Sequence, residues 1–252
     1  MIRGYLFTGV YYVLSLICVM LALPAMLLPG QAAVRGLVRL YTLSTRFALR
    51  WIAGISTNVR GKHLLPEGPF ILAAKHQSWG DGFLIYPEVN NLVFVTGDHL
   101  EKFPLVGRIL TKLGAIVIDT CGGSHRRAES LAEGVQQAKE EGRRVLIYPE
   151  GHLAPFGFHF PYKPGVWHMQ QAMGVPVVPV ATNLGLFWQQ QEILKKPGKA
   201  VIEFLDPIQP GLSKSEFLAL LESRVEGRCS DLARKAGREG KSELLPEPVR
   251  AG

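Results

Sequence analysis

The sequence predicts an α/β fold: a mixed, mostly parallel β-sheet flanked by helices, with an N-terminal membrane-associated helical segment. Three observations predict it. Short apolar runs alternate with helical patterns along most of the chain, as in layered α/β folds. The apolar runs are nearly continuous, as in strands that are covered on both faces. No residue between Arg3 and Arg35 is charged, which sets the beginning of the chain apart from the rest.

The composition of the 252 residues favours a lipid partner over nucleic acid. Hydrophobic residues make up 47% and charged residues 19%, which is more apolar than an ordinary soluble enzyme and predicts a membrane segment. The net charge of +7 suits either nucleic acid or anionic lipid. No nucleic acid is expected, because the arginines concentrate beside the apolar N-terminus and no recognised nucleic-acid-binding module is present.

Neither a disulfide framework nor a metal site is predicted. The three cysteines are scattered without a CxxC spacing, at Cys18, Cys121 and Cys229. The seven histidines show no HExxH or comparable ligand spacing. A reducing, cytoplasm-facing environment is the simplest interpretation, and no cofactor is expected.

Residues 1–50 are predicted to be membrane-anchoring helices, the first of them at residues 5–28. As a helix this uncharged run would be about 36 Å long, more than the roughly 30 Å of a hydrocarbon core. A cleaved signal peptide is the alternative, but its apolar region usually has about 7–15 residues, and no A-x-A site follows cleanly. Pro29 and Gly30 are expected to end the helix.

Residues 33–50 are predicted to be a basic amphipathic helix. Its spacing places four arginines on one helical face, namely Arg35, Arg39, Arg46 and Arg50. A solvated face is the alternative, but beside an apolar anchor we interpret this face as lying among phospholipid headgroups. Only Arg3 precedes the apolar run, so if this run spans the membrane, the charge bias places the rest of the chain on the cytoplasmic side. The compact layout with a single anchor is typical of a bacterial protein, so the inner membrane is the expected location. Both a spanning helix and a helical hairpin that dips into the bilayer remain open.

Residues 51–236 are predicted to alternate strands and helices in one domain. The predicted strands are residues 55–60, 70–74, 92–95, 115–118, 144–148, 176–181 and 200–205. The predicted helices are residues 104–112, 124–141, 165–173 and 213–235. Pro176 and Pro179 predict that their strand lies at an edge of the sheet or is bent. Residues 237–252 are polar and contain prolines, so this tail is predicted to be disordered.

A histidine and an aspartate, His76 and Asp81, follow the apolar run at 70–74. On a continuous helix they would not meet, since five residues place them about 140° apart around the axis. A turn at Gly80 would fold Asp81 back, so that its carboxylate accepts the Nδ1 proton and leaves Nε2 to take a proton from a hydroxyl. This is the His-Asp half of a hydrolase triad, with the hydroxyl supplied by a substrate. A hydrogen-bonded loop histidine is the alternative.

A second apolar strand also ends in a polar turn. In "VLIYPEGHLAPFG", residues 145–157, Glu150 stands between Pro149 and Gly151, and the glycine permits a substrate to approach closely. Both polar turns follow predicted strands, where α/β folds gather functional groups. We therefore expect them to converge on one cleft.

These stretches resemble the glycerolipid acyltransferase family. The blocks "HQSWGD", "LGAIVIDT", "YPEG" and "VPVVPV" follow the family's order, and the resemblance covers roughly residues 50–210. It implies transfer of a fatty acyl group from acyl-CoA or acyl carrier protein to the hydroxyl of a lysophospholipid, with 1-acylglycerol-3-phosphate giving phosphatidic acid. His76 would be the general base, Asp81 its orienting partner, and Glu150 and Gly151 part of the acceptor-binding turn. No G-x-S-x-G elbow and no cysteine beside a histidine is present, so direct transfer without an acyl-enzyme is expected.

Two blocks depart from the family pattern. Thr120 stands where the family has a phosphate-binding arginine, and His152 and Leu153 replace its Thr-Arg pair. A phosphomonoester needs charge-assisted donors, preferably arginine. The candidate substitutes are Arg126, Arg127, His152 and Lys163. The two arginines have a plainer interpretation as solvated helix residues, and His152 has one as a hydrogen-bonded turn residue.

The departures keep two alternatives open. The first is the same chemistry on another acceptor, such as a lyso-ornithine lipid. The second, from another class, is a lipid-binding membrane protein that retains the fold without activity. The intact His76, Asp81 and Glu150 argue against the second.

Overall fold

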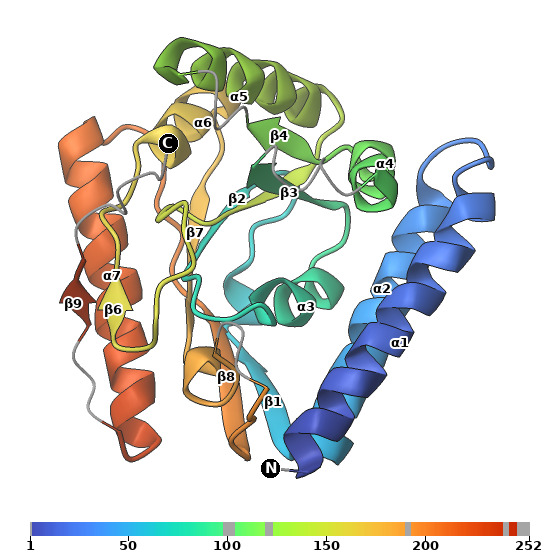
Figure 1. Cartoon of the computed structure of the whole chain (residues 1–252). Coiled ribbons are helices and arrows are strands. Elements are labelled where there is room, and N and C mark those ends of the chain that lie inside the picture. The colour runs from blue at the N-terminus through green and yellow to red at the C-terminus, as the bar shows by residue number, and fades with distance from the viewer. Residues whose placement is uncertain (1, 98–103, 119–122, 190–192, 239–241, 246–252) are drawn as a thin grey trace.

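A seven-stranded sheet forms the centre of the molecule (Figure 1). The computed structural model describes residues 2–97, 104–118, 123–189, 193–238 and 242–245. The strands are β1 Ile55–Arg60, β2 Ile71–Ala74, β3 Leu92–Gly97, β4 Ile116–Ile118, β5 Arg144–Ile147, β7 Val177–Thr182 and β8 Gly198–Phe204. They stand in the order β1-β8-β7-β2-β5-β3-β4, with β7 and β8 antiparallel and the other neighbouring pairs parallel. The predicted mixed, mostly parallel sheet is confirmed.

Helices cover both faces of this sheet. They are α1 Ile2–Ala25, α2 Ala32–Ala48, α3 Asp81–Ile85, α4 Pro104–Leu113, α5 Gly123–Glu140, α6 Gly165–Met173 and α7 Lys214–Lys235. In Figure 1, α1, α2 and α3 lie on one side, and α5, α6 and α7 on the other. Because successive side chains of a strand point to opposite faces, Leu72 and Ala74 of β2 enter the first core, while Ile71 and Ala73 enter the second.

β7, which contains Pro179 and directly follows Pro176, is an interior strand. Of the two predicted alternatives, the edge strand is therefore wrong, and the bent strand stays a prediction. β7 lies between β2 and β8. The N–H of Ile71 and that of Lys75 donate to carbonyls of Pro176 and Val180, so the alternate residue Pro179 faces β8. The β8 ladder begins only at Val180, and the Pro179 carbonyl accepts the N–H of Leu205 at 2.9 Å. Pro179 therefore precedes the first paired residue of β7 and β8, and its missing N–H costs this ladder no hydrogen bond.

The N-terminal helices share the first core with the α/β domain. Phe7 of α1 and Leu49, in the π-helical turn Leu49–Ala53 that follows α2, are almost completely buried there. The Phe7 ring packs edge-on against Trp188, with centroids 5.2 Å apart. Near its other end α1 buries Ala22 against Ile109 of α4. Both ends of α1 therefore contact the rest of the chain.

The four arginines of residues 33–50 were predicted to face phospholipid headgroups, but Arg46 faces the domain. Its guanidinium forms an ion pair with Glu88, and its Nε donates to the Thr57 hydroxyl at 2.6 Å. Lys62 contributes a second ion pair to the same carboxylate at 2.9 Å. Arg46 therefore faces the domain, because the carboxylate of Glu88, in the 3-10 helix Tyr86–Glu88 before β3, attracts it, whereas Arg50 is exposed.

The C-terminal tail is not structureless throughout, contrary to the prediction for residues 237–252. Glu243–Leu244 form β9, which pairs in parallel with β6, Phe158–His159. The Ser242 hydroxyl donates to Glu226 Oε2 at 2.5 Å and lies 3.0 Å from Nδ1 of His159. These polar contacts hold a sequence that is too polar to form a core of its own.

Candidate active site

His76 and Asp81 meet in the turn between β2 and α3. The His76 Nδ1 lies 3.1 Å from Asp81 Oδ2, the contact that the sequence predicts. The turn requires glycine at position 80, because a β-carbon there would lie 2.6 Å from the ring of Trp188 and 2.9 Å from Leu184. The missing side chain therefore allows Asp81, the first residue of α3, to fold back under the imidazole.

The Asp81 carboxylate is fixed by three donors at a single oxygen. Its Oδ2 accepts the N–H groups of Gln77 and Ser78, each at 2.8 Å, in addition to the contact with His76. The Asp81 side chain is completely buried, whereas that of His76 is 23% exposed. Among the described residues no hydrogen-bond partner faces Nε2 of His76. With Nδ1 held by the carboxylate, Nε2 is the nitrogen that can take a proton from a substrate.

Tyr148 fixes the plane of the imidazole. Its ring stacks on that of His76, with centroids 3.9 Å apart and an angle of 15° between the planes. Burial raises the pKa of Tyr148 well above its usual value, and the charge of Asp81 adds to the effect. The phenol therefore remains neutral beside the base. No sequence pattern predicted this contact, although Tyr148 directly precedes the turn at Pro149 and Glu150.

The Glu150 carboxylate lies beneath its turn and contacts the backbone of the base. Its Oε1 accepts the His76 N–H at 3.3 Å, and its Oε2 accepts the N–H of Phe160 at 3.0 Å. The Ala154 N–H donates to the His76 carbonyl at 2.9 Å. The turn after β5 therefore holds both backbone groups of His76. The Glu150 side chain is completely buried, and its role in acceptor binding stays a prediction.

A buried lysine, Lys75, is the ion-pair partner of Glu150. Its ammonium donates to Glu150 Oε2, to the Phe158 carbonyl and to Glu226 Oε1, each at 3.0 Å. Glu226, on α7, also accepts the Tyr162 hydroxyl at 2.8 Å. Burial alone would lower the pKa of Lys75, but the two carboxylates outweigh it and raise the pKa above its usual value. The charged lysine thus connects the end of β2, the turn after β5, and α7.

The sequence analysis missed this ion-pair cluster of Lys75, Glu150 and Glu226. Glu150 follows Lys75 by 75 positions and Glu226 follows it by 151 positions, so no local spacing brings the three together. The one available signal was a lysine directly after the apolar run at 70–74, because a buried lysine must be paired.

Three predicted acceptor ligands come together at the rim of the Glu150 turn. Gly151 has a φ of +68°, and a β-carbon there would lie 3.1 Å from Lys163 Nζ. Lys163 Nζ lies 3.5 Å from His152 Nε2, and the Lys163 N–H donates to the Pro149 carbonyl at 2.8 Å. The rim therefore carries an ammonium and an imidazole beside an exposed glycine backbone, a set that suits an anion.

The remaining sequence predictions fall partly outside the described residues. Arg126 and Arg127 belong to α5, but their side chains lie outside the described part of the chain, as does Thr120. Leu153 is partly buried in the turn after His152. The structure therefore brings together His76, Asp81, Glu150 and the Gly151 rim.

Comparison with known proteins assigns the chain to a family. The model of a family described as Acyltransferase matches residues 56–183, about half of the chain. The chain belongs to this acyltransferase family. A 1-acyl-sn-glycerol-3-phosphate acyltransferase of Pseudomonas aeruginosa is 28% identical over 224 residues, which are 89% of this chain and 87% of the relative. The yeast protein of the same name, from Saccharomyces cerevisiae, is 22% identical over 75% of this chain and 63% of its own length.

A solved structure shares the fold of this acyltransferase. The crystal structure of the 1-acyl-sn-glycerophosphate acyltransferase of Thermotoga maritima superposes with a TM-score of 0.75, covering 92% of this chain and 96% of the other at 22% identity. His76, Asp81 and Glu150 lie inside the family match, whereas Glu226 on α7 lies beyond its end. The ion-pair cluster is therefore completed by a residue from outside the matched region.

Proposed function

We propose that this acyltransferase moves a fatty acyl group from acyl-CoA or acyl carrier protein to the free hydroxyl of 1-acylglycerol-3-phosphate, giving phosphatidic acid. The observation that carries the proposal is the His76–Asp81 contact, which leaves Nε2 of a partly exposed imidazole to meet a substrate. The backbone of His76 is bonded to the turn that carries the Gly151 rim, through the Glu150 carboxylate and the Ala154 N–H. The names of the Pseudomonas and yeast relatives support the choice of acceptor.

The reaction proceeds by direct attack of the acceptor. Nε2 of His76 takes the hydroxyl proton while the oxygen forms a bond to the thioester carbonyl carbon. The carbon–sulfur bond then breaks, and the imidazolium returns the proton to the departing thiolate. Asp81 stabilises the imidazolium that exists between the two proton transfers. Its side chain is already fixed by Gln77 and Ser78, so it need not reorganise during the reaction.

The rim at Gly151 is the proposed site of the acceptor phosphate. Lys163 supplies a positive charge there, and the Nε2 ring nitrogen of His152 lies 3.5 Å from its ammonium. Both positions would serve in place of the arginines that the family carries elsewhere. The exposed backbone of Gly151 would allow the phosphate to approach without a side chain in its path.

A panel of acceptors tests this function. Purified protein is supplied with an acyl thioester and one lysolipid at a time, and release of free thiol is followed. We expect release with 1-acylglycerol-3-phosphate, and a loss of about tenfold or more in kcat/KM for this acceptor in Lys163→Gln, because one charge-assisted contact is removed. Preference for an uncharged-headgroup lysolipid or a lyso-ornithine lipid would reject the phosphate assignment. No release with any acceptor would reject the enzymatic proposal.

We further propose that α1 and α2 lie along the cytoplasmic face of a membrane as a helical hairpin. Helix α1 is apolar enough to cross a bilayer, with a mean hydropathy of 2.3 over its most apolar 18 residues. Both of its ends nevertheless contact the domain, through Phe7 and Ala22. A spanning helix would carry one of these ends about 30 Å away.

The outer surface of the hairpin supports this arrangement. Most exposed large apolar side chains of the described chain lie on these two helices and on the π-helical turn, among them Leu16, Met20, Phe47 and Trp51. Exposed apolar side chains gathered on one pair of helices favour immersion among lipid chains.

Protease access distinguishes the hairpin from a spanning helix. Tags are placed at both ends of the chain, and membrane vesicles are prepared with their cytoplasmic face outward. We expect the protease to remove both tags, because a hairpin leaves both ends on one side of the bilayer. Removal of the C-terminal tag with full protection of the N-terminal tag would show a spanning helix instead.

A further inference from the structure

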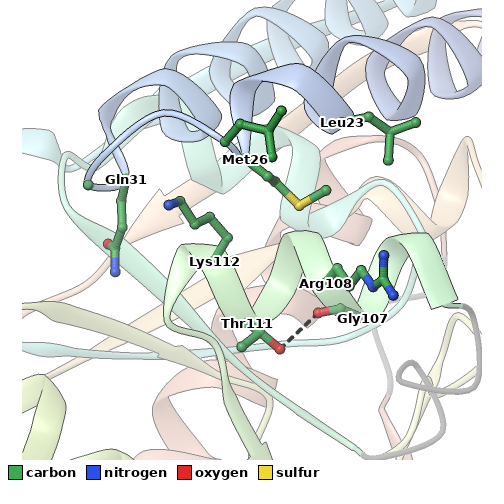
Figure 2. A pocket seen from close by; sticks show the side chains of 9 residues that line it. Leu23, Met26, Gln31, Gly107, Arg108, Thr111 and Lys112 are labelled. Carbon is green, nitrogen blue, oxygen red and sulfur yellow. Dashed lines mark hydrogen bonds between the residues drawn. The ribbon is translucent and has the colours of Figure 1, made fainter.

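A groove separates the last turns of α1 from α4 (Figure 2). It has a volume of about 960 Å³, within the range of small-molecule sites. Its lining comes from the end of α1, the following turn and one face of α4: Leu23, Met26, Leu27, Gly30, Gln31, Gly107, Arg108, Thr111 and Lys112. In Figure 2, Leu23 and Met26 extend from α1 toward α4, Lys112 extends from α4 toward the turn after α1, and Arg108 runs along α4.

Helical spacing explains how α4 supplies both a packed face and a cationic one. Ile109 and Leu113 are four residues apart and are buried against Ala22 of α1. Arg108 and Lys112, also four residues apart, precede them by one position and therefore line the groove beside this contact. The buried pair fixes the helix, and the two cations are held next to apolar side chains.

The charge of the groove is entirely positive. No aspartate or glutamate is among the lining residues. Within the described part of the chain, neither cation forms an ion pair with a carboxylate, and Lys112 donates to the Leu28 carbonyl at 3.0 Å. Apolar walls with two cations at one side complement a molecule that has a hydrocarbon chain and an anionic headgroup.

The groove is separate from the proposed catalytic site. Helix α4 ends at Leu113, just before β4 begins at Ile116, whereas His76 follows the end of β2. Because β2, β5, β3 and β4 are parallel, all four begin on one side of the sheet and end on the other. The start of β4 and the end of β2 therefore lie at opposite ends of the strands. None of the residues described above around His76 lines the groove.

We propose that the groove between α1 and α4 binds an anionic membrane phospholipid, with its phosphate at Arg108 and Lys112 and an acyl chain along Leu23 and Met26. The inference rests on the proposed membrane hairpin, because α1 and the turn after it line one wall of the groove, and Leu27 of this wall is exposed. A lipid held there would anchor α4 and α1 to the leaflet without entering the catalytic turn.

Binding to vesicles of two compositions tests the proposal. Full-length protein is sedimented with phosphatidylcholine vesicles, with and without phosphatidylglycerol, at constant ionic strength. The variant Arg108→Gln/Lys112→Gln is compared with Lys214→Gln/Lys235→Gln, which removes two exposed cations from α7 on the opposite side of the sheet. We expect the preference for anionic vesicles to fall about fivefold for each groove cation, and less than about twofold in the control. Equal losses in the two variants would overturn the proposal.

Two further measurements locate the lipid and identify its source. A photoreactive phosphatidylglycerol should crosslink to residues 23–31 or 107–112, and crosslinks confined to other segments would contradict the site. Inorganic phosphate should leave the crosslink intact, whereas displacement by phosphate alone would indicate a free-anion site. Arg108→Gln by itself covers the case in which the double variant fails to fold, since Arg108 forms no polar contact within the described chain. Thiol release by the variants reports separately on the proposed catalytic function.

Discussion

Replacing Lys75 by methionine is expected to lower the free energy of unfolding by about 3–5 kcal/mol, the usual effect of removing one partner from a buried ion pair. The Lys75 ammonium is completely buried and donates to Glu150 and Glu226, each at 3.0 Å. Methionine has a similar volume but no charge, so the two carboxylates would remain buried without their shared cation. Such carboxylates must either stay charged at high cost or take up protons.

Chemical denaturation followed by tryptophan fluorescence measures this effect. The control is Lys235→Met, an exposed lysine in the last turn of α7, which should change the unfolding free energy by less than about 0.5 kcal/mol. Adding Glu226→Gln to Lys75→Met should recover part of the loss, because it removes one of the unpaired charges. A Lys75→Met variant as stable as the control would contradict the assignment of a charged, paired lysine.

The same substitution should also reduce turnover. Glu150 accepts the N–H of His76 through one oxygen and the Lys75 ammonium through the other. Without the ammonium, the Glu150 carboxylate can shift. The backbone of His76, whose N–H donates to this carboxylate, can then shift with it. We expect kcat to fall more than KM rises, because the acceptor rim at Gly151 and Lys163 is held separately, through the Lys163 N–H and the Pro149 carbonyl.

Local patterns were sufficient to predict the elements and the first catalytic contact. Continuous apolar runs predicted the strands, because a strand covered on both faces has no polar positions. The His76–Asp81 contact was predictable because five residues and one glycine determine it. Each of these features depends on neighbours in the sequence.

The errors concern contacts between distant parts of the chain. The sequence correctly predicted that Glu150 follows a strand. Its carboxylate lies under the turn because it pairs with Lys75, which also pairs with the distant Glu226. Pro179 is tolerated in an interior strand because of where the β8 ladder begins, which its own sequence does not encode. Arg46 faces the domain because Glu88, from a later loop, attracts it.

Replacing His76 by alanine should lower the rate of acyl transfer by about 10²–10⁴-fold, the range expected when a general base is removed. Among the described residues, the imidazole makes one side-chain hydrogen bond, to Asp81, and one stacking contact, with Tyr148. The Asp81 carboxylate would keep its bonds to the N–H groups of Gln77 and Ser78. The fold and the binding to vesicles should therefore be almost unchanged.

Acceptor-dependent thiol release, compared between the natural protein and His76→Ala in the same vesicles, tests whether His76 takes the hydroxyl proton. We expect the natural protein to release thiol only when a lysolipid is present, and the variant to lose this release while its unfolding transition and vesicle binding stay the same. Transfer by the variant within about tenfold of the natural protein, which is less than general-base catalysis contributes, would show that another group takes the hydroxyl proton.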